Sequence, residues 1–168
     1  MHKDPAPVKV EGVILDHKSR SFAVVLKDEL NKKWLPIFIG PFEAQAIAFE
    51  LDGIKLPRPA THDLIRNIFE IMGAVITRVC VCDLRENTFY AVIETMADGK
   101  TRSIDSRPSD AIAVALRAKA PLFVAREVLD KAGLDSMPSD AHPAGETPAG
   151  AKLKILADAL HEAVQAEN

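Results

Sequence analysis

Residues 105–110, with the sequence DSRPSD, bring two carboxylates, two hydroxyls and a guanidinium together between a predicted strand and a predicted helix. Functional residues often lie in such connections. Arg107 can bind a phosphate through paired hydrogen bonds, and the free N–H groups at a helix start also bind phosphate. Asp105 and Asp110 carry the oxygen ligands that Mg²⁺ and Mn²⁺ prefer. Alternatively, Ser109 or Asp110 only caps the helix and Arg107 pairs with a neighbouring acid.

A second candidate is the run Thr61-His62-Asp63, with Arg66 one helical turn later. His62, near a predicted helix start, can act as a general base or as a metal ligand. Asp63 can bind a divalent cation. The alternative is that Thr61 caps the helix and the Asp63 carboxylate interacts favourably with the positive end of the helix dipole. In that case His62 and Arg66 belong to an ordinary exposed surface.

Glu43 and Glu50 lie on one face of a predicted helix, two turns and roughly 10 Å apart along its axis. One metal ion cannot bridge them at that separation, and a solvated helix face explains the pair equally well. Cys80 and Cys82 share one face of a predicted strand. Two thiols with no third ligand nearby do not form a zinc site, so we interpret both as structural.

The chain has 168 residues, 48% hydrophobic and 27% charged, which is typical of one soluble domain with a sizeable core. No apolar run approaches the ~20 residues needed to span a bilayer, and the first residues lack the apolar core of a signal peptide. Two cysteines are too few for a disulfide framework. We therefore expect a cytoplasmic protein with reduced thiols.

The net charge of −3 argues against nucleic-acid binding by bulk electrostatic attraction. Residues 134–168 carry six acidic and two basic residues, so residues 1–133 are nearly neutral. Any phosphate contact must therefore depend on local groups or on a bound metal. The chain has no glycine-rich phosphate loop and no GxSxG motif. One Trp, one Tyr and seven Phe give weak support to a stacking platform for single strands.

Hydrophobic periodicity and turn residues predict eleven elements that group the strands into hairpins. The predicted strands are 8–16, 21–28, 33–39, 75–84, 88–96, 101–105 and 121–125, and the predicted helices are 42–53, 61–72, 107–118 and 126–133. Strands in hairpins favour an α+β fold with a mixed or antiparallel sheet and three main helices. Pro36 predicts an edge position or a bulge, and Asp98-Gly99 predicts a hairpin turn. Alternation places Val8, Val10, Gly12 and Ile14 on one side of the first strand.

The chain divides into three parts by composition. Residues 1–133 form the predicted domain, and residues 134–150 are a Pro/Ala-rich acidic segment typical of a linker. Residues 151–168 predict a C-terminal helix with an apolar stripe of Leu153, Leu156, Leu160 and Val164. That stripe needs a partner, either the core or a second copy of the chain. A homo-oligomer is expected, with a dimer favoured because two-fold dimers are the commonest closed assembly.

Three segments together resemble the bifunctional nuclease family. They are LPIFIGPFEAQAIAFELDGIKLPRPATHDL, FYAVIE and IDSRPSDAIAVALRAKAPLFVAREVLD, and the resemblance extends over most of residues 8–130. It implies a compact α+β domain of a bacterial and plant family that hydrolyses DNA and RNA. The polar positions that match the family's motifs are Glu43, Gln45, Thr61, His62, Asp63, Asp105, Arg107, Ser109 and Asp110.

We therefore expect a nuclease that hydrolyses phosphodiester bonds with the help of Mg²⁺ or Mn²⁺. The predicted metal ligands are Glu43, Asp63, Asp105 and Asp110. The predicted catalytic residues are His62, Asp63, Asp105, Arg107 and Asp110, and the predicted substrate-binding residues are Arg66, Arg107 and Ser109. The alternative is a non-catalytic, oligomeric binding or regulatory module of the same fold. A concave carboxylate cluster with shifted pKa values would favour the nuclease, and a closed Arg107–Asp110 ion pair would favour a structural turn.

Overall fold

The computed structural model describes residues 5–16, 19–30 and 32–137, which form seven strands and four helices in the predicted order. The strands are β1 (Ala6–Asp16), β2 (Ser21–Asp28), β3 (Trp34–Ile39), β4 (Val75–Arg85), β5 (Thr88–Ala97), β6 (Lys100–Ser106) and β7 (Leu122–Val124). The helices are α1 (Pro41–Leu51), α2 (Thr61–Ile71), α3 (Pro108–Ala118) and α4 (Arg126–Ala132). Within the described ranges, each helix is too short or too polar to cross a bilayer.

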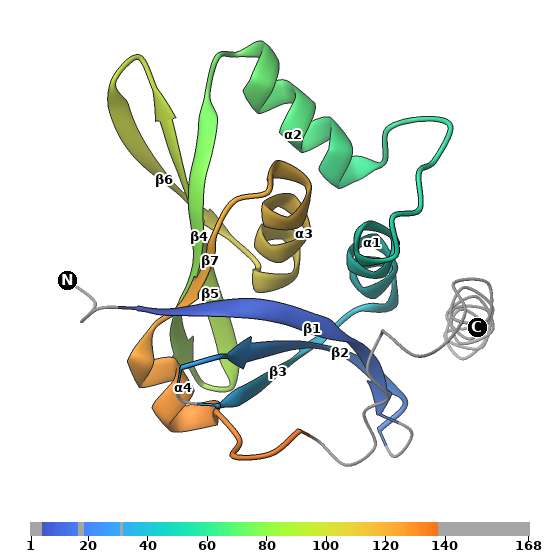
Figure 1. Ribbon diagram of the computed structural model, residues 1–168, viewed down its shortest axis with the longest axis vertical. Coiled ribbons are helices and arrows are strands. Elements are labelled where there is room, and N and C mark those ends of the chain that lie inside the picture. Colours follow the sequence, from blue (N-terminus) through green and yellow to red (C-terminus); the bar gives the residue numbers. More distant parts are fainter. Residues whose placement is uncertain (1–4, 17–18, 31, 138–168) are drawn as a thin grey trace.

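All seven strands form one mixed sheet in the order β3-β2-β1-β7-β4-β5-β6. Only β4 and β7 pair in parallel, and every other neighbouring pair is antiparallel. The short β7 joins a unit of β1, β2 and β3 to a unit of β4, β5 and β6. Figure 1 shows the two units at a steep angle to each other. This arrangement confirms the predicted α+β fold.

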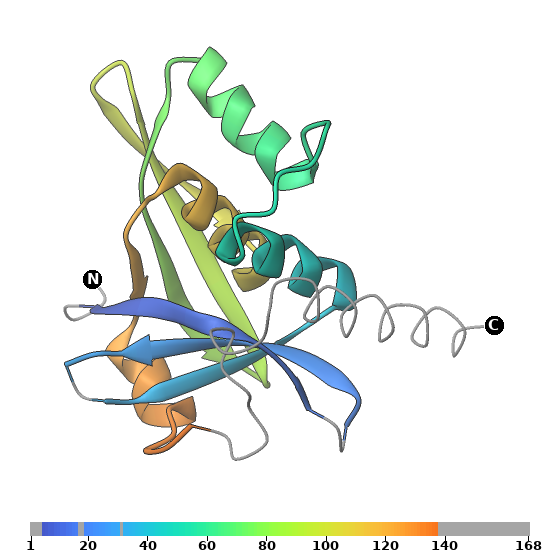
Figure 2. The same ribbon diagram turned by 45° about the vertical axis from the view of Figure 1, so that its right-hand side comes forward.

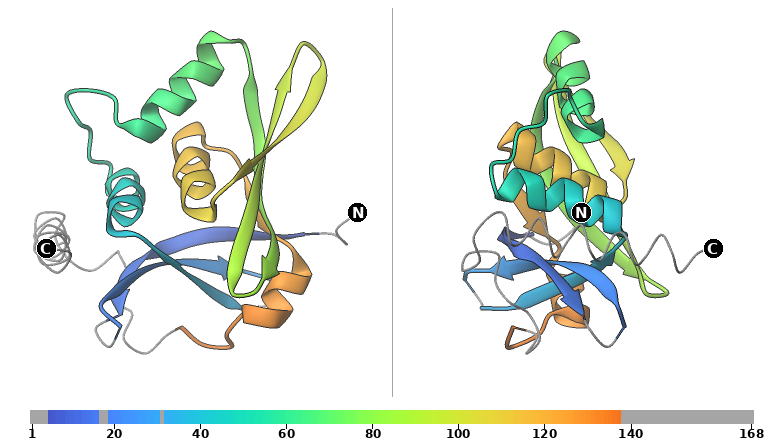
Figure 3. Two further views of the ribbon diagram at one scale, coloured as in Figure 1. Left: turned by 180° about the vertical axis from the view of Figure 1, so that it is seen from behind. Right: turned by 90° about the vertical axis from the view of Figure 1, so that its right-hand side faces the viewer.

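Helix α3 lies in the angle between the two halves of the sheet (Figure 1), and this position explains its composition. Ala111, Ile112, Ala113, Val114 and Ala115 are all buried, so the helix is covered on most of its surface. Small side chains allow α1 and the strands to approach it closely. Helices α1 and α3 pack side by side and α2 packs over α3 (Figure 2). Helix α4 lies apart from these three, at the lower end of the sheet (Figure 3).

A bulge in β1 changes which of its side chains share a face. The register with β2 shifts between Val10 and Gly12, and one extra residue reverses the alternation beyond that point. Val8 and Val10 pack in the main core, whereas Ile14 belongs to a separate cluster. The prediction that Val8, Val10 and Ile14 share one side was therefore wrong, because strict alternation assumes a regular strand.

Two local turn and edge predictions are confirmed. Pro36 lies in β3, which is an edge strand, so its missing N–H interrupts no ladder between two neighbours. Asp98 and Gly99 connect β5 to β6 with φ values of 51° and 70°. Positive φ at both central residues is the requirement of a type I′ hairpin turn.

The N-cap of α2 is one residue before Thr61, which the sequence suggested as the cap. Thr61 is the first helical residue, and Ala60 occupies the N-cap. The backbone N–H of Ala60 donates to Asp63 Oδ2 at 2.9 Å. Asp63 therefore supplies the cap from inside the first turn, so the hydroxyl of Thr61 is not needed for it.

One buried cation connects three helices. The side chain of Arg117 in α3 is 3% exposed. Its Nε donates to Asp63 Oδ1 of α2 at 2.7 Å, its Nη2 to the carbonyl of Ala46 in α1 at 3.0 Å, and its Nη1 to Ala113 of α3 at 3.0 Å. Since a buried charge is costly unless it is paired and hydrogen-bonded, these acceptors fix the helices relative to one another.

The described chain ends beside β3. Leu134 and Trp34 exchange two backbone hydrogen bonds of 2.7 and 2.8 Å. Most of the predicted linker 134–150 and the whole predicted helix 151–168 lie outside the described residues. The division of the chain into domain, linker and terminal helix therefore stays a prediction.

Replacing Arg117 by Met is expected to lower the free energy of unfolding by about 3–5 kcal/mol, because it leaves Asp63 without its partner in a partly buried site. Urea unfolding followed by circular dichroism measures this change. Arg102→Met on the exposed strand β6 is the control and should change stability by less than about 0.5 kcal/mol. Equal effects of the two substitutions would show that Arg117 does not hold the helices together.

Asp63 also makes stability depend on pH. Burial alone would raise the pKa of Asp63, but the Ala60 N–H and Arg117 outweigh it and lower that pKa. The stabilisation is therefore present above the unfolded-state pKa of about 3.9 and is lost as pH falls through the lower folded-state pKa. Asp63→Asn should cost about 1.5–3 kcal/mol at pH 7, and the difference from the wild type should shrink below pH 4.

Urea unfolding of both proteins at a series of pH values tests this dependence. Asp130→Asn, which removes an exposed carboxylate from α4, is the matched control and should follow the wild type at every pH. A loss of stability in Asp63→Asn that stays constant down to pH 3 would contradict the assigned role.

Candidate functional site

The first turns of α1, α2 and α3 meet around a pocket of about 380 Å³. Its polar lining includes Glu43 and Gln45 from α1, His62 from α2, and Arg107 and Asp110 from the start of α3. Segments far apart in the sequence thus form one concave surface. The pocket therefore brings the three motif segments together at one place.

Four of these side chains form a continuous chain of polar contacts. His62 Nε2 lies 3.0 Å from Asp110 Oδ1. Arg107 Nε donates to Asp110 Oδ2 at 2.7 Å, and Arg107 Nη1 lies 3.0 Å from Glu43 Oε1. The chain runs from the buried ring of His62 to the guanidinium of Arg107, which is 66% exposed. A ligand in the pocket can therefore contact Arg107 while His62 stays fixed by Asp110.

The electrostatics of this chain keep Asp110 ionised. Burial alone would raise the pKa of Asp110, but hydrogen bonds and charge from Arg107 and His62 outweigh burial and lower that pKa. The hydrogen bond to Asp110 in turn raises the pKa of Arg107. An ionised carboxylate only accepts hydrogen bonds, so His62 Nε2 must carry the proton that it shares with Asp110. In a neutral ring, Nδ1 is then the proton acceptor.

Local sequence explains why Glu43 reaches Arg107. Pro41 occupies the first turn of α1, where the missing N–H costs nothing, and Glu43 follows in that turn. The Glu43 carboxylate lies against Gly40, where a Cβ would overlap Oε2. Gly40 thus leaves room for the carboxylate beside the pocket.

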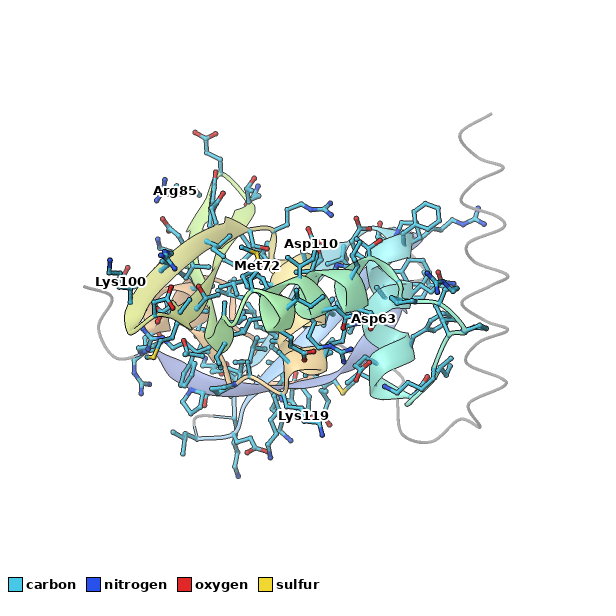
Figure 4. All side chains as sticks on the ribbon, turned by 90° about the horizontal axis from the view of Figure 1, so that it is seen from above. Asp63, Met72, Arg85, Lys100, Asp110 and Lys119 are labelled. Carbon is cyan, nitrogen blue, oxygen red and sulfur yellow. The ribbon has the colours of Figure 1, made fainter. Side chains whose placement is uncertain are left out.

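Asp63 has a structural position at the edge of the site. Both of its carboxylate oxygens are occupied, one by Arg117 Nε and the other by the Ala60 N–H. Figure 4 shows Asp63 and Asp110 both well away from the hairpin ends marked by Arg85 and Lys100. Asp63 therefore orders the helices that carry the pocket, and it does not line the pocket itself.

Asp105 is not brought to the pocket. In the register of β5 and β6, Ile104 is opposite Ile93 and Asp105 is opposite Val92. Ile93 is buried in the core against the helices, so the alternation turns Asp105 to the other face of the sheet. There it lies near Cys82, whose thiol pKa is raised first by burial and also by nearby carboxylates including Asp105.

The two other predicted substrate contacts also lie outside the pocket lining. Ser109 is 6% exposed, buried beneath the start of α3. Arg66 lies one turn beyond His62 and pairs with Glu70 of the same helix at 3.5 Å. Of the three predicted substrate-binding residues, only Arg107 lines the pocket.

The predicted cluster of four carboxylates does not form within the described part of the chain. No group of three or more His, Cys, Asp or Glu there is arranged to hold a metal ion. Asp63 is engaged by Arg117 and Asp105 lies on the opposite face, for the reasons above. Glu43 and Asp110 remain, with the Arg107 guanidinium contacting both. These two carboxylates would have to exchange Arg107 for a divalent ion, whose other ligands would come from water and phosphate.

Sequence reasoning missed three residues of this region. Arg117 lies two turns after Asp110, hence on the same face of α3, and this spacing was the available signal. Phe42 and Phe49 line the apolar side of the pocket. They are seven residues apart on α1, a spacing that core residues also show.

The sequence pattern described as the bifunctional nuclease domain matches residues 24–137. An uncharacterized protein of Mycobacterium tuberculosis is 39% identical over 127 residues, which cover 76% of this chain and 76% of that protein.

Bifunctional nuclease 1 of Oryza sativa subsp. indica is 29% identical over 116 residues, 67% of this chain and 35% of its own length. Bifunctional nuclease 2 of Arabidopsis thaliana is 25% identical over 128 residues, 74% of this chain and 37% of its own length. The pattern match covers more than half of the chain, and it includes every residue that lines the pocket. The chain therefore belongs to the bifunctional nuclease domain family.

Proposed function

We propose that this protein is a nuclease that hydrolyses phosphodiester bonds of DNA and RNA in the pocket between α1, α2 and α3. The single observation that carries the proposal is the His62–Asp110 pair beside the exposed Arg107 in a concave site. The family name, and the names of the plant relatives, supply the reaction class. The substrate is a nucleic acid in this proposal.

Arg107 binds the phosphate in this mechanism. Its guanidinium is mostly exposed and can donate two parallel hydrogen bonds to phosphate oxygens, which places the phosphorus at the mouth of the pocket. Glu43 and Asp110 hold the guanidinium in position before substrate arrives. The positive charge also stabilises the charge that develops on the phosphate oxygens.

His62 transfers the proton. Its Nδ1 accepts a proton from water while the water oxygen attacks phosphorus and the bond to the leaving oxygen breaks. The leaving oxygen then takes a proton from solvent. Asp110 accepts the Nε2 hydrogen bond, fixes the ring tautomer and stabilises the imidazolium that forms. His62 is thus the general base, and Asp110 is its positioning residue.

We also propose that Mg²⁺ or Mn²⁺ assists the reaction. Glu43 and Asp110 are the residues that would hold the ion, because they are the two carboxylates of the pocket lining, and Arg107 would release them as it binds the phosphate. A bound divalent ion supplies charge neutralisation on the phosphate and a more acidic water. A cytoplasmic location and a homodimer complete the proposal, on the composition and on the commonness of two-fold dimers.

Asp110→Asn tests the site. It should lower kcat/KM about 10²–10⁴-fold on single-stranded DNA, duplex DNA and RNA, because it removes the charge that orients and stabilises His62. Asp105→Asn is the matched control, five residues away on the opposite face, and should keep wild-type activity. Assays with Mg²⁺, with Mn²⁺ and with EDTA measure metal dependence, and melting curves check that both variants fold.

The outcomes separate the two parts of the proposal. Equal loss of cleavage in both variants would place the active site elsewhere, and cleavage unchanged by either substitution would indicate a contaminant. Full activity in EDTA would contradict metal assistance without contradicting the site.

A binding or regulatory module without catalysis is the second candidate. The closed Arg107–Asp110 ion pair at 2.7 Å is the observation that favours it, since a structural turn would contain that pair. In that case the purified wild-type protein cleaves none of the three substrates with any metal. Asp110→Asn would then lower only thermal stability.

A further inference from the structure

Helix α1 is apolar on two opposite faces. Ala44 and Ile47 are fully buried against the core. Phe42, Ala46 and Phe49 follow at intervals of four and three residues on the opposite side, where they line the pocket. Phe42 is 66% exposed. The core therefore explains one apolar face of α1, and the other faces the pocket, with Phe42 exposed and Ala46 and Phe49 partly buried.

The pocket is lined by both apolar and polar side chains. The apolar ones include Phe42 and Phe49 from α1 and the half-exposed Leu56 from the connector after it. Arg107 and His62 are among the polar ones. A lining of this mixed kind suits a ligand that combines a flat apolar ring with an anion.

We propose that Phe42 is a specificity-determining residue that stacks on one unpaired nucleobase while Arg107 binds the adjacent phosphate. An exposed aromatic ring and a cation that line the same pocket offer both contacts that a nucleotide needs. The pocket volume of about 380 Å³ is in the range of small-ligand sites and is suited to one nucleotide. This inference rests on the proposed function for its substrate class.

Base pairing decides which nucleic acids can use such a pocket. In a duplex, each base is stacked between neighbours and its ring faces are not accessible, so it would first have to leave the helix. An unpaired base has a free face at no such cost. Single-stranded DNA or RNA is therefore bound better than duplex of the same sequence. Gln45, which also lines the pocket, provides an amide donor and acceptor for the edge of the base.

Phe38 provides a matched control for Phe42. Its side chain is 61% exposed, close to the 66% of Phe42, but it belongs to the edge strand β3 and does not line the pocket. Substitution of either residue by Ala removes one phenyl ring of similar exposed area. Any general effect of losing surface aromatic area therefore appears in both variants.

The experiment measures binding of full-length protein to fluorescent 12-nucleotide probes by anisotropy, in the presence of Mg²⁺. The probes carry phosphorothioate linkages, which resist hydrolysis, and they are single-stranded, duplex or abasic. Phe42→Ala should weaken binding to the single strand roughly tenfold, whereas Phe42→Trp should retain it and Phe38→Ala should not change it. Binding to the abasic strand, which has phosphates but no bases, should be the same for the wild type and Phe42→Ala.

Several results would overturn the inference. They are equal binding by Phe42→Ala and the wild type, an equal loss on the abasic strand, duplex binding as tight as single-strand binding, or no binding by the wild type. Cleavage by the wild type together with an indifferent Phe42→Ala would reject the stacking role and leave the nuclease intact. Base-dependent binding through Phe42 without cleavage of any substrate would support the stacking role and reject the nuclease.

Discussion

The buried guanidinium of Arg117 is the contact on which the pocket depends. It reaches acceptors on α1, α2 and its own helix α3, and a buried cation with any of these missing would be costly. The three helix starts that surround the pocket are therefore held as one unit. The small residues of α3 permit this arrangement, because they let the helix fit in the angle between the two halves of the sheet.

The first turns of α1, α2 and α3 each contain one acidic residue, and the three residues have different roles. Asp63 caps its own helix and pairs with Arg117. Glu43 lies against Gly40 and contacts Arg107. Asp110 joins Arg107 to His62. An acidic residue in the first turn of a helix interacts favourably with the helix dipole, and all three helices have one for this reason. Packing against the neighbouring helices determines which of the three carboxylates faces the pocket.

The site is a chain of paired charges between two carboxylates and one guanidinium. Arg107 satisfies Glu43 and Asp110 in the absence of ligand, and its large exposed area leaves it accessible to a phosphate. The apolar outer face of α1 extends the same pocket toward Phe42 and Phe49. A pocket lined by both polar and apolar side chains suits a nucleotide better than it suits an isolated phosphate or a wholly apolar ligand.

The sequence by itself determined the elements, their order and the motif that marks the family, because alternation, Pro36, Asp98-Gly99 and the helix starts act through near neighbours. The residue types also determined which chemistry is available: proton transfer by His62, phosphate binding by Arg107 and a carboxylate at Asp110. Only the tertiary structure decided where side chains such as Asp105 and Arg117 go, since the first depends on strand register and the second on three helices meeting. Register and helix packing are long-range properties, so spacing along the chain could not reveal that Asp105 faces away or that Asp63 is structural.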